Sequence, residues 1–458
     1  MPKPTRRRAA THLGPLLALV LSPAACDGGP DGAVADGGTA DAAPRGPDAG
    51  PAGACPPGGT GLACLFDLYD EARSGCDSDR LAELGASLAA RHGDLPAWIT
   101  TEAGGRALFV TMGAPAAVAG DFNQWSSTAL VTAPLCGGPI HAAEAAIPTG
   151  SYRYKLFAND LWKLDPGNWA FAFDDFGGNP DGRNSVLNTY DSGRGHLVQP
   201  DQDVCSLELG NCRRFHTYLP PGYGAPEAGE RRYPALFMHD GQNIFDDTDC
   251  CFGHTGWEVN RQLDADIASG EIEPVVVIGF PHAGAARTDE YGFSSAAGGL
   301  QETFMAFQVG TVQPRAAALW RLDAQRYYVA GSSLGGLLSA RLAFAYPQVY
   351  AGAASLSGSF WVGQDTNTAM SDFAAQTGKI SMALYQDHGG TAQTGSDNYP
   401  DNVALRDQLV GLGWRRGDSP SCTRGPDALC YFHDVGATHD ELAWQARSYR
   451  FLRFFFTN

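Results

Sequence analysis

The sequence is short of positive charge, and this shortage restricts the partners that the protein can have. It contains 32 lysines and arginines against 50 aspartates and glutamates, which gives a formal net charge of −18 at pH 7. A balance this acidic repels phosphate backbones and anionic membrane surfaces. We therefore expect no nucleic-acid partner.

Long apolar runs and metal-binding motifs are also missing. Beyond the first 25 residues, no stretch is apolar over the roughly 20 residues that a membrane-spanning helix requires. The sequence has neither a repeated Cys-x-x-Cys nor a His-Glu-x-x-His, which are the patterns of common zinc sites. We therefore expect no transmembrane helix, no metal ion and no cofactor. Apolar residues make up 44% of the 458 residues, so global disorder is excluded and two domains can form.

The first 25 residues have the pattern of an export signal. Basic residues at 3–8 precede an apolar run over 13–25 that is too short to span a bilayer. The run leads into Cys26 after two alanines, which resembles a bacterial lipobox, where the cysteine is lipidated and becomes the mature N-terminus. Cleavage by ordinary signal peptidase after Ala25 is the alternative, because Pro23 stands where a leucine is usual. We expect a lipid anchor on Cys26 that holds the protein to the cell envelope, at the outer membrane or the cell surface, rather than a free secreted form.

The other cysteines predict disulfides, because an exported chain meets an oxidising compartment. If one of the eleven cysteines carries lipid, ten remain, which is an even number. The two closely spaced pairs predict local bridges, and the remaining connectivity is left open. The close pairs are Cys205 with Cys212 and Cys422 with Cys430, and the others are Cys55, Cys64, Cys76, Cys136, Cys250 and Cys251.

Composition and periodicity divide the chain into a tether and folded parts. Residues 26–54 are nearly all Asp, Gly, Ala and Pro and cannot repay the entropy of ordering, so they form a flexible tether after the signal peptide over 1–25. Residues 55–100 contain cysteines and a short helix around 81–91. Short alternating strands with turn residues over 101–195 are typical of a small immunoglobulin-like β-sandwich.

The remainder, residues 205–458, has the sequence pattern of an α/β domain. Uninterrupted apolar runs at 235–238 and 275–278 indicate strands buried on both faces. They alternate with helical stretches such as 334–346, which Pro347 ends. We therefore predict a mainly parallel sheet with helices on both faces.

A candidate nucleophile lies in this part. Gly-Ser-Ser-Leu-Gly at 331–335 is Gly-x-Ser-x-Gly, placed between a short strand at 327–330 and a helix. In this context Ser333 occupies a strained turn that exposes its hydroxyl, and the N–H of Leu334 at the helix N-terminus can stabilise an oxyanion. As a bare pattern the motif is common by chance, and the strand and helix around it favour the nucleophile.

The sequence around this serine resembles the putative-esterase family of α/β-hydrolases. The resemblance is carried by His-Asp-Gly-Gln-Asn-Ile-Phe-Asp at 239–246 after a strand, followed downstream by the Gly-x-Ser-x-Gly-Gly segment. The family includes enterochelin, feruloyl and acetyl-xylan esterases. The resemblance implies a second oxyanion N–H on Gly241 or Gln242.

The family's base is a histidine near the C-terminus. Gly-Ala-Thr-His over 436–439, with a tryptophan five residues on, is similar to the family's segment and implies His439 as the general base. His433 and His388 are the rivals. The acid must lie between the serine and the histidine. The strand at 380–385 precedes an Asp-rich loop, where the resemblance favours Asp397, with Asp387 and Asp401 as alternatives.

The front domain has a likeness of its own. Val-Ala-Gly-Asp-Phe-Asn-Gln-Trp at 118–125 resembles the signature of glycogen-binding modules. The likeness implies sugar contacts through four positions, because aromatic faces stack on sugar rings and polar groups bond the hydroxyls. The alternative is a domain that serves as a lid beside the active site. The four positions are Trp125, Lys155, Trp162 and Asn184.

Together these features predict an exported lipoprotein with serine carboxylic-ester hydrolase activity. The expected substrate is an acyl or feruloyl ester of a polysaccharide. A siderophore ester is the second candidate, and a non-catalytic carbohydrate-binding lipoprotein is the alternative from another class.

Overall fold

The computed structural model describes most of the chain beyond its first 61 residues. The predicted signal peptide, Cys26 and the tether lie outside the described residues, as do Cys55, Cys250 and Cys251 and the side chain of Cys64. Among the described residues, no helix has both the length and the apolar character needed to cross a membrane. The described ranges are 62–90, 97–101, 104–173, 182–189, 191–225, 228–245, 256–292, 299–364 and 369–457.

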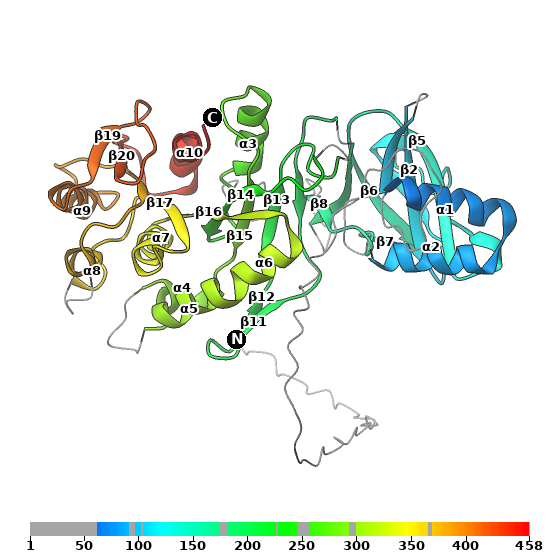
Figure 1. Ribbon diagram of the computed structural model, residues 1–458, viewed down its shortest axis with the longest axis horizontal. Coiled ribbons are helices and arrows are strands. Elements are labelled where there is room, and N and C mark those ends of the chain that lie inside the picture. The colour runs from blue at the N-terminus through cyan, green and yellow to red at the C-terminus, as the bar shows by residue number, and fades with distance from the viewer. Residues whose placement is uncertain are drawn as a thin grey trace, which may run out of the picture. The chain divides into compact units, whose positions relative to one another are not determined.

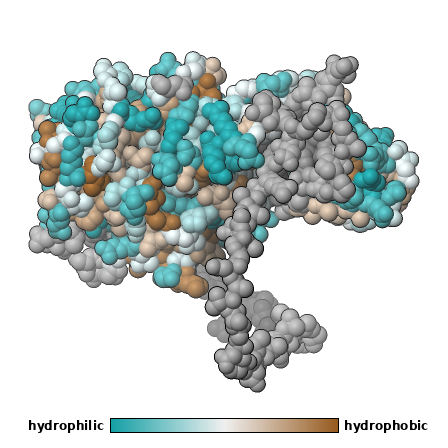
Figure 2. Space-filling model, in the orientation of Figure 1, coloured by the Kyte–Doolittle hydropathy of each residue, from teal (hydrophilic) through white to brown (hydrophobic). Residues whose placement is uncertain are grey.

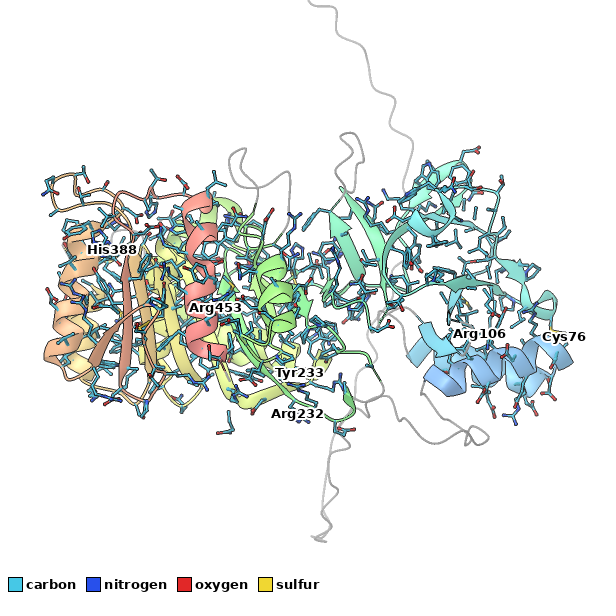
Figure 3. All side chains as sticks on the ribbon, turned by 90° about the horizontal axis from the view of Figure 1, so that it is seen from above. Cys76, Arg106, Arg232, Tyr233, His388 and Arg453 are labelled. Atoms are coloured by element: carbon cyan, nitrogen blue, oxygen red, sulfur yellow. A yellow bond between two sulfur atoms is a disulfide. The ribbon has the colours of Figure 1, made fainter. Side chains whose placement is uncertain are left out.

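Two helices and a four-stranded sheet form the first part. Helices α1 (Leu62–Gly75) and α2 (Ser78–Ala90) cover one face of the sheet, with Phe66 and Leu84 packed against Leu108. The helix predicted at 81–91 is α2, and α1 was not predicted. Arg106 ties the sheet to α1, because it lies 2.8 Å from both Asp70 and Glu144 (Figure 3). The strand order is β1 (Ala97–Thr101), β2 (Gly104–Met112), β5 (Ile140–Ile147) and β4 (Ala133–Pro134).

The other face of this sheet packs on strands that belong to the sheet of the C-terminal part. Phe109 of β2 lies in one apolar cluster with Val118, Tyr154 and Leu187 from these strands. The strands continue by hydrogen bonding into β15, where β13 pairs antiparallel with it. One layer of the front domain is therefore an extension of the larger sheet. The extension runs β13 (His216–Leu219), β10 (His196–Val198), β8 (Ala170–Phe173), β9 (Arg183–Asn188), β6 (Ser151–Ala158) and β3 (Ala117–Gly120), with β7 (Leu161–Lys163) beside β6.

The C-terminal part is built on a parallel sheet, which confirms the predicted α/β class. In the run of strands from β15 to β19, every pair of neighbours is parallel. Side chains along β14 alternate between two apolar clusters: Phe237 belongs to one, whereas Leu236 and Met238 belong to the other. The order is β15 (Val276–Phe280), β14 (Tyr233–His239), β16 (Leu322–Ser332), β17 (Tyr350–Leu356), β18 (Ala383–His388), β20 (Ala428–His433) and β19 (Arg415–Asp418).

Helices cover both faces of this sheet (Figure 1). Helices α3 and α10 lie side by side on one face, where Arg453 of α10 pairs with Asp266 of α3 at 2.8 Å (Figure 3). Several helices contribute to the apolar cluster on the opposite face, so the sheet is buried on both sides. The helices are α3 (Val259–Ala268), α4 (Arg287–Tyr291), α5 (Gln301–Phe307), α6 (Gln313–Leu319), α7 (Leu334–Ala345), α8 (Met370–Thr377), α9 (Tyr399–Gly411) and α10 (Glu441–Phe456), with a π-helix over Gln308–Val312.

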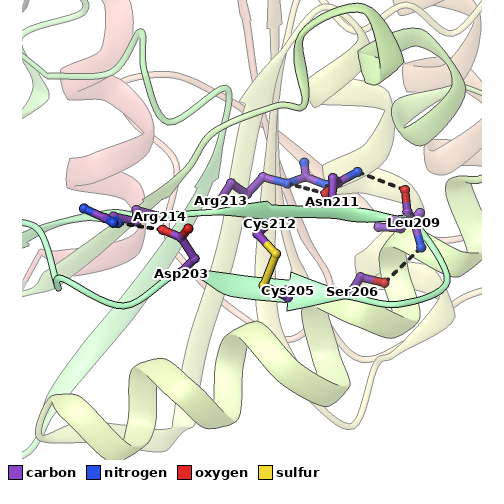
Figure 4. Close-up of a disulfide and its surroundings, with 8 residues drawn as sticks. All are labelled: Asp203, Cys205, Ser206, Leu209, Asn211, Cys212, Arg213 and Arg214. Carbon is purple, nitrogen blue, oxygen red and sulfur yellow. Dashed lines mark hydrogen bonds and ion pairs between the residues drawn. A yellow bond between two sulfur atoms is a disulfide. The ribbon is translucent and has the colours of Figure 1, made fainter. Parts of the chain in front are cut away.

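Disulfides join separate segments in the described residues. Cys205–Cys212 links β11 (Val204–Ser206) to β12 (Asn211–Arg213), as Figure 4 shows. Cys422–Cys430 is the second predicted local bridge. Cys76–Cys136 spans 60 residues and joins the link between α1 and α2 to the turn between β4 and β5. On the face seen in Figure 2, apolar side chains of the described residues are scattered and do not form one patch.

Candidate active site

Ser333 lies on a sharp turn between β16 and α7. Its backbone has φ 55° and ψ −122°, a conformation that non-glycine residues rarely adopt. The strand and helix pass so closely that a Cβ on Gly331 would lie 2.6 Å from the carbonyl carbon of Gly335. The turn is held by the Ser333 N–H, which donates to the Leu356 carbonyl at 2.9 Å. Glycine at 331 is therefore required for the turn that presents the serine hydroxyl.

His439 follows the last strand and faces this hydroxyl. Its Nε2 lies 2.9 Å from the Ser333 Oγ. The imidazole packs edge-on against Trp444, with ring centroids 5.0 Å apart. Asp440 caps α10 immediately afterwards by accepting a hydrogen bond from the Ala443 N–H at 3.0 Å. The cap fixes where the helix begins, and so fixes the loop residue that precedes it.

Asp397 is the carboxylate that lies against His439. Its Oδ1 is 2.6 Å from the His439 Nδ1, and its side chain is fully buried. Its Oδ2 accepts hydrogen bonds from the Ser357 hydroxyl at 2.7 Å and from the Gly389 N–H. With Oδ1 accepting, Nδ1 carries the proton, which leaves Nε2 free to accept one from the serine.

The two alternative acids lie elsewhere. The strand predicted at 380–385 starts later and runs on to His388, so Asp387 is inside β18 and not in the loop. Asp387 is buried and accepts from Arg447 at 2.9 Å, and burial raises its pKa to about 6 although Arg447 opposes the shift. Asp401 is in the first turn of α9 and accepts from the Gln364 amide at 2.8 Å. Neither contacts His439.

The rival histidines also have other partners. His388 is buried in β18, where its Nε2 lies 2.7 Å from the Tyr431 hydroxyl and burial lowers its pKa to about 4 (Figure 3). His433 stacks on His388 and lies 2.9 Å from the Gly390 carbonyl. Both therefore have structural contacts, and His439 is the histidine beside Ser333.

The oxyanion prediction needs one correction. The N–H of Gly241 donates to the Phe280 carbonyl at 3.0 Å, so it is not available to a substrate. A Cβ at this position would lie 2.2 Å from the carbonyl carbon of Gly279, which explains the glycine as a close approach of the loop to β15. Within the described residues, the N–H groups of Gln242 and Leu334 make no hydrogen bond, and both follow strand ends at the same edge of the sheet. These two N–H groups therefore remain as the candidates for oxyanion donors.

The comparisons identify the C-terminal part. Residues 206–402 match the family model described as "Putative esterase". The match covers less than half of the 458 residues, so the similarity to this family is a property of this stretch. The uncharacterized protein YbbA of Bacillus subtilis (strain 168) is 26% identical over 199 residues, covering 41% of this chain and 73% of that protein.

Solved structures of esterases are similar to the chain at low identity. Ferric enterobactin esterase from Salmonella typhimurium has 18% identity and a TM-score of 0.42, covering 81% of this chain and 98% of that one. A feruloyl esterase module from Clostridium thermocellum has 17% identity and a TM-score of 0.39, covering 58% and 89%. The family match supports a hydrolase of ester bonds.

Buried polar side chains behind the Ser333 turn connect β14 to neighbouring helices. His239, at the end of β14, has its Nε2 2.9 Å from the side-chain Oε1 of Gln308 and its Nδ1 2.9 Å from the Ser339 hydroxyl. Burial lowers its pKa to about 4, so it stays neutral and serves to brace β14 against α7. Asp240 forms a two-point ion pair with Arg287 at 2.7 and 2.8 Å. Within the described residues, no group of acidic, histidine or cysteine side chains could hold a metal ion.

Two residues of the site were not found from the sequence. The Ser357 hydroxyl lies 2.7 Å from the Asp397 Oδ2, and the Arg447 Nη2 lies 3.7 Å from the same oxygen. Neither belongs to a motif, and they are 90 residues apart in the chain. Arg447 comes three residues after Trp444, so both lie on one side of α10. The spacing alone does not show that this side of the helix faces Asp397.

The predicted sugar-contact residues divide into two groups. Trp125 and Trp162 form an edge-to-face pair with ring centroids 6.3 Å apart, and Trp162 is 44% exposed. The Trp125 indole N–H donates to Asp121 at 3.0 Å. Lys155 and Asn184 are buried, at 7% and 3% exposure, so neither presents an open polar group at the surface.

Proposed function

We propose that the protein is a serine carboxylic-ester hydrolase that works through an acyl-enzyme. The observation that carries the proposal is the unbroken row of hydrogen bonds from the Ser333 hydroxyl through His439 to Asp397. Nucleophile, base and orienting carboxylate within hydrogen-bond reach are what acyl transfer requires. The esterase family match supports the same chemistry.

In the proposed reaction Ser333 attacks the ester carbonyl and transfers its proton to the Nε2 of His439. The N–H groups of Gln242 and Leu334 stabilise the developing oxyanion, and the His439 imidazolium is stabilised by Asp397. His439 then returns the proton to the leaving alcohol. Water, activated by the same histidine, attacks the acyl-enzyme and releases the acid and the free serine.

The Ser333→Ala variant tests this proposal. We expect p-nitrophenyl acetate turnover to fall on the order of 10³-fold or more, because the serine and histidine act as a unit. Ser421→Ala, at an exposed serine in the loop after β19, is the control and should keep turnover within about twofold. A Ser333→Ala protein that folds normally and keeps wild-type turnover would refute the serine mechanism.

For the substrate we favour an acyl or feruloyl ester of a polysaccharide. The support is the Trp125–Trp162 pair on the front domain, in which Trp162 is exposed, because aromatic faces suit the apolar faces of sugar rings. A siderophore ester is the second candidate. Initial rates on a panel of acetyl-xylan, feruloylated oligosaccharide and catecholate esters distinguish them, and a catecholate preference would overturn the polysaccharide assignment.

For location we propose a lipid-anchored, exported protein. The support is the basic and apolar pattern before Cys26, together with the three disulfides of the described residues. A non-catalytic carbohydrate-binding lipoprotein is the competing function, and the intact hydrogen-bonded row argues against it.

A further inference from the structure

A buried arginine connects two carboxylates beneath the site. Arg447 on α10 is 1% exposed, and its Nε donates to Asp387 at 2.9 Å. Its Nη2 donates to the Ser357 hydroxyl at 2.6 Å and lies 3.7 Å from the Asp397 Oδ2. A guanidinium taken out of water at this depth is costly unless its charge is compensated. The arrangement therefore uses Asp387 as the close counter-charge of Arg447.

Ser357 has only one way to orient its hydroxyl proton. Its Oγ receives hydrogen bonds from the Arg447 Nη2 at 2.6 Å and from the Trp444 Nε1 at 3.0 Å. Both of these nitrogens are donors only, so the hydroxyl must give its own proton to the remaining neighbour. That neighbour is the Asp397 Oδ2 at 2.7 Å. The direction of this bond is thus fixed by chemistry as well as by geometry.

These bonds leave Asp397 little freedom to rotate. Oδ2 is held by Ser357 and the Gly389 N–H, which turns Oδ1 toward the His439 Nδ1 at 2.6 Å. The residue itself has φ 52°, a left-handed conformation that aspartate tolerates better than most residues. The carboxylate is therefore positioned from the side opposite the histidine.

We propose that Arg447, Asp387 and Ser357 form a positioning unit that aligns Asp397 and sets how strongly it stabilises the charged form of His439. The proposal rests on the serine-esterase function proposed above. None of the three residues touches the substrate: they act through Asp397. The two charged residues of the unit have opposite effects on the His439 imidazolium, because Arg447 disfavours a nearby positive charge and Asp387 favours one. Ionisable groups around Asp397 and His439 include the N-cap residue Asp440, Glu441 and Arg447 of α10, and Tyr385, Asp387 and His388 of β18.

Opposite shifts of the pH–rate profile test the proposal. His439 must be neutral to accept the serine proton, so kcat/KM rises with pH along an acid limb. Arg447→Met removes a positive charge near Asp397, which favours the imidazolium and should move this limb to higher pH. Asp387→Asn removes a negative charge and should move it to lower pH. Each shift should be on the order of half to one pH unit.

A matched control separates this role from a structural one. Arg453→Met on the same helix also breaks an arginine–aspartate pair, with Asp266, but on the side facing α3. It should lower the melting temperature without moving the acid limb. Ser357→Ala should lower kcat about tenfold or more with KM nearly unchanged, since it removes the donor that orients Asp397.

The outcomes separate this proposal from the esterase assignment. If the acid limb of the kcat/KM profile stays in place in both charge variants, or moves in the same direction in both, the positioning role is wrong. The esterase assignment would still stand in that case, provided that Ser333→Ala abolishes activity. If Arg447→Met does not fold, Asp387→Asn, which keeps the size of the side chain, and Ser357→Ala, which removes a single oxygen, decide the matter. Activity that survives in Ser333→Ala would instead overturn the function on which the proposal rests.

Discussion

Replacing Gly241 by alanine places a methyl group where the loop after β14 touches β15. The new Cβ would lie 2.2 Å from the Gly279 carbonyl carbon and 2.5 Å from the Phe280 nitrogen, both of them backbone atoms. Contacts of a Cβ below 3.0 Å are essentially never observed, so the loop must move away by roughly 0.8 Å. That movement breaks the hydrogen bond from the Gly241 N–H to the Phe280 carbonyl and displaces the adjoining Gln242 N–H.

The expected cost follows from the size of this displacement. A shift of about 1 Å in a positioning group can lower activity on the order of 10²-fold, so Gly241→Ala should reduce kcat/KM by about that factor. Overpacking against backbone should also destabilise the fold by about 1–3 kcal/mol. Steady-state kinetics on p-nitrophenyl acetate and urea unfolding measure the two effects.

Gly411→Ala provides the control for this substitution. Gly411 ends α9 and has open space where its Cβ would be, so alanine should leave kcat/KM unchanged and stabilise the helix slightly. If Gly241→Ala keeps kcat/KM within twofold of wild type, the loop does not place an oxyanion donor and the reasoning is wrong.

Three further predictions concern stability, sugar binding and the anchor. Removing the Cys76–Cys136 bridge should lower the free energy of unfolding by about 4 kcal/mol and removing Cys205–Cys212 by about 2.5 kcal/mol, because the unfolded chain gains more entropy when the longer loop is opened. Urea unfolding of the two Cys→Ala double variants should rank them in this order, and the reverse ranking would contradict the chain-entropy account. Alanine at both Trp125 and Trp162 should abolish retention on insoluble polysaccharide while small-ester turnover survives; loss of turnover together with a lowered melting temperature would instead indicate a lid or packing role. Cys26→Ser should release the protein from membranes, and mass spectrometry of a wild-type N-terminus without diacylglyceryl would refute the anchor.

Two residues of the candidate site could be predicted from residues close to them in the sequence. The turn at Ser333 depends on residues that are neighbours in the chain: a buried strand, glycines without a Cβ and a helix that starts at Leu334. Such a turn is specified within about ten residues, so its pattern is visible without the fold. The position of His439 between the last strand and the capped helix α10 is local in the same sense.

The carboxylate could not be decided this way. The sequence left Asp397, Asp387 and Asp401 open, because where a strand ends determines which aspartates leave the sheet. Strand β18 continues to His388 through its pairing with β17 and β20, and this pairing buries Asp387 against α10. Only the tertiary structure therefore assigns one aspartate to His439 and another to Arg447.

The oxyanion donor and the support beneath Asp397 were likewise decided by contacts between distant segments. Gly241 and Gln242 are adjacent in the chain, and it is the approach of β15 that engages the N–H of the first and leaves that of the second. Ser357 and Arg447 come from different elements and meet only because α10 packs on β17 and β18. The sequence by itself thus indicated the proposed nucleophile and base, because each lies in a pattern of residues that are close together in the chain. The proposed acid, the proposed oxyanion donor and the buried charges depended on long-range packing, because a sequence pattern does not show which segments the sheet brings together.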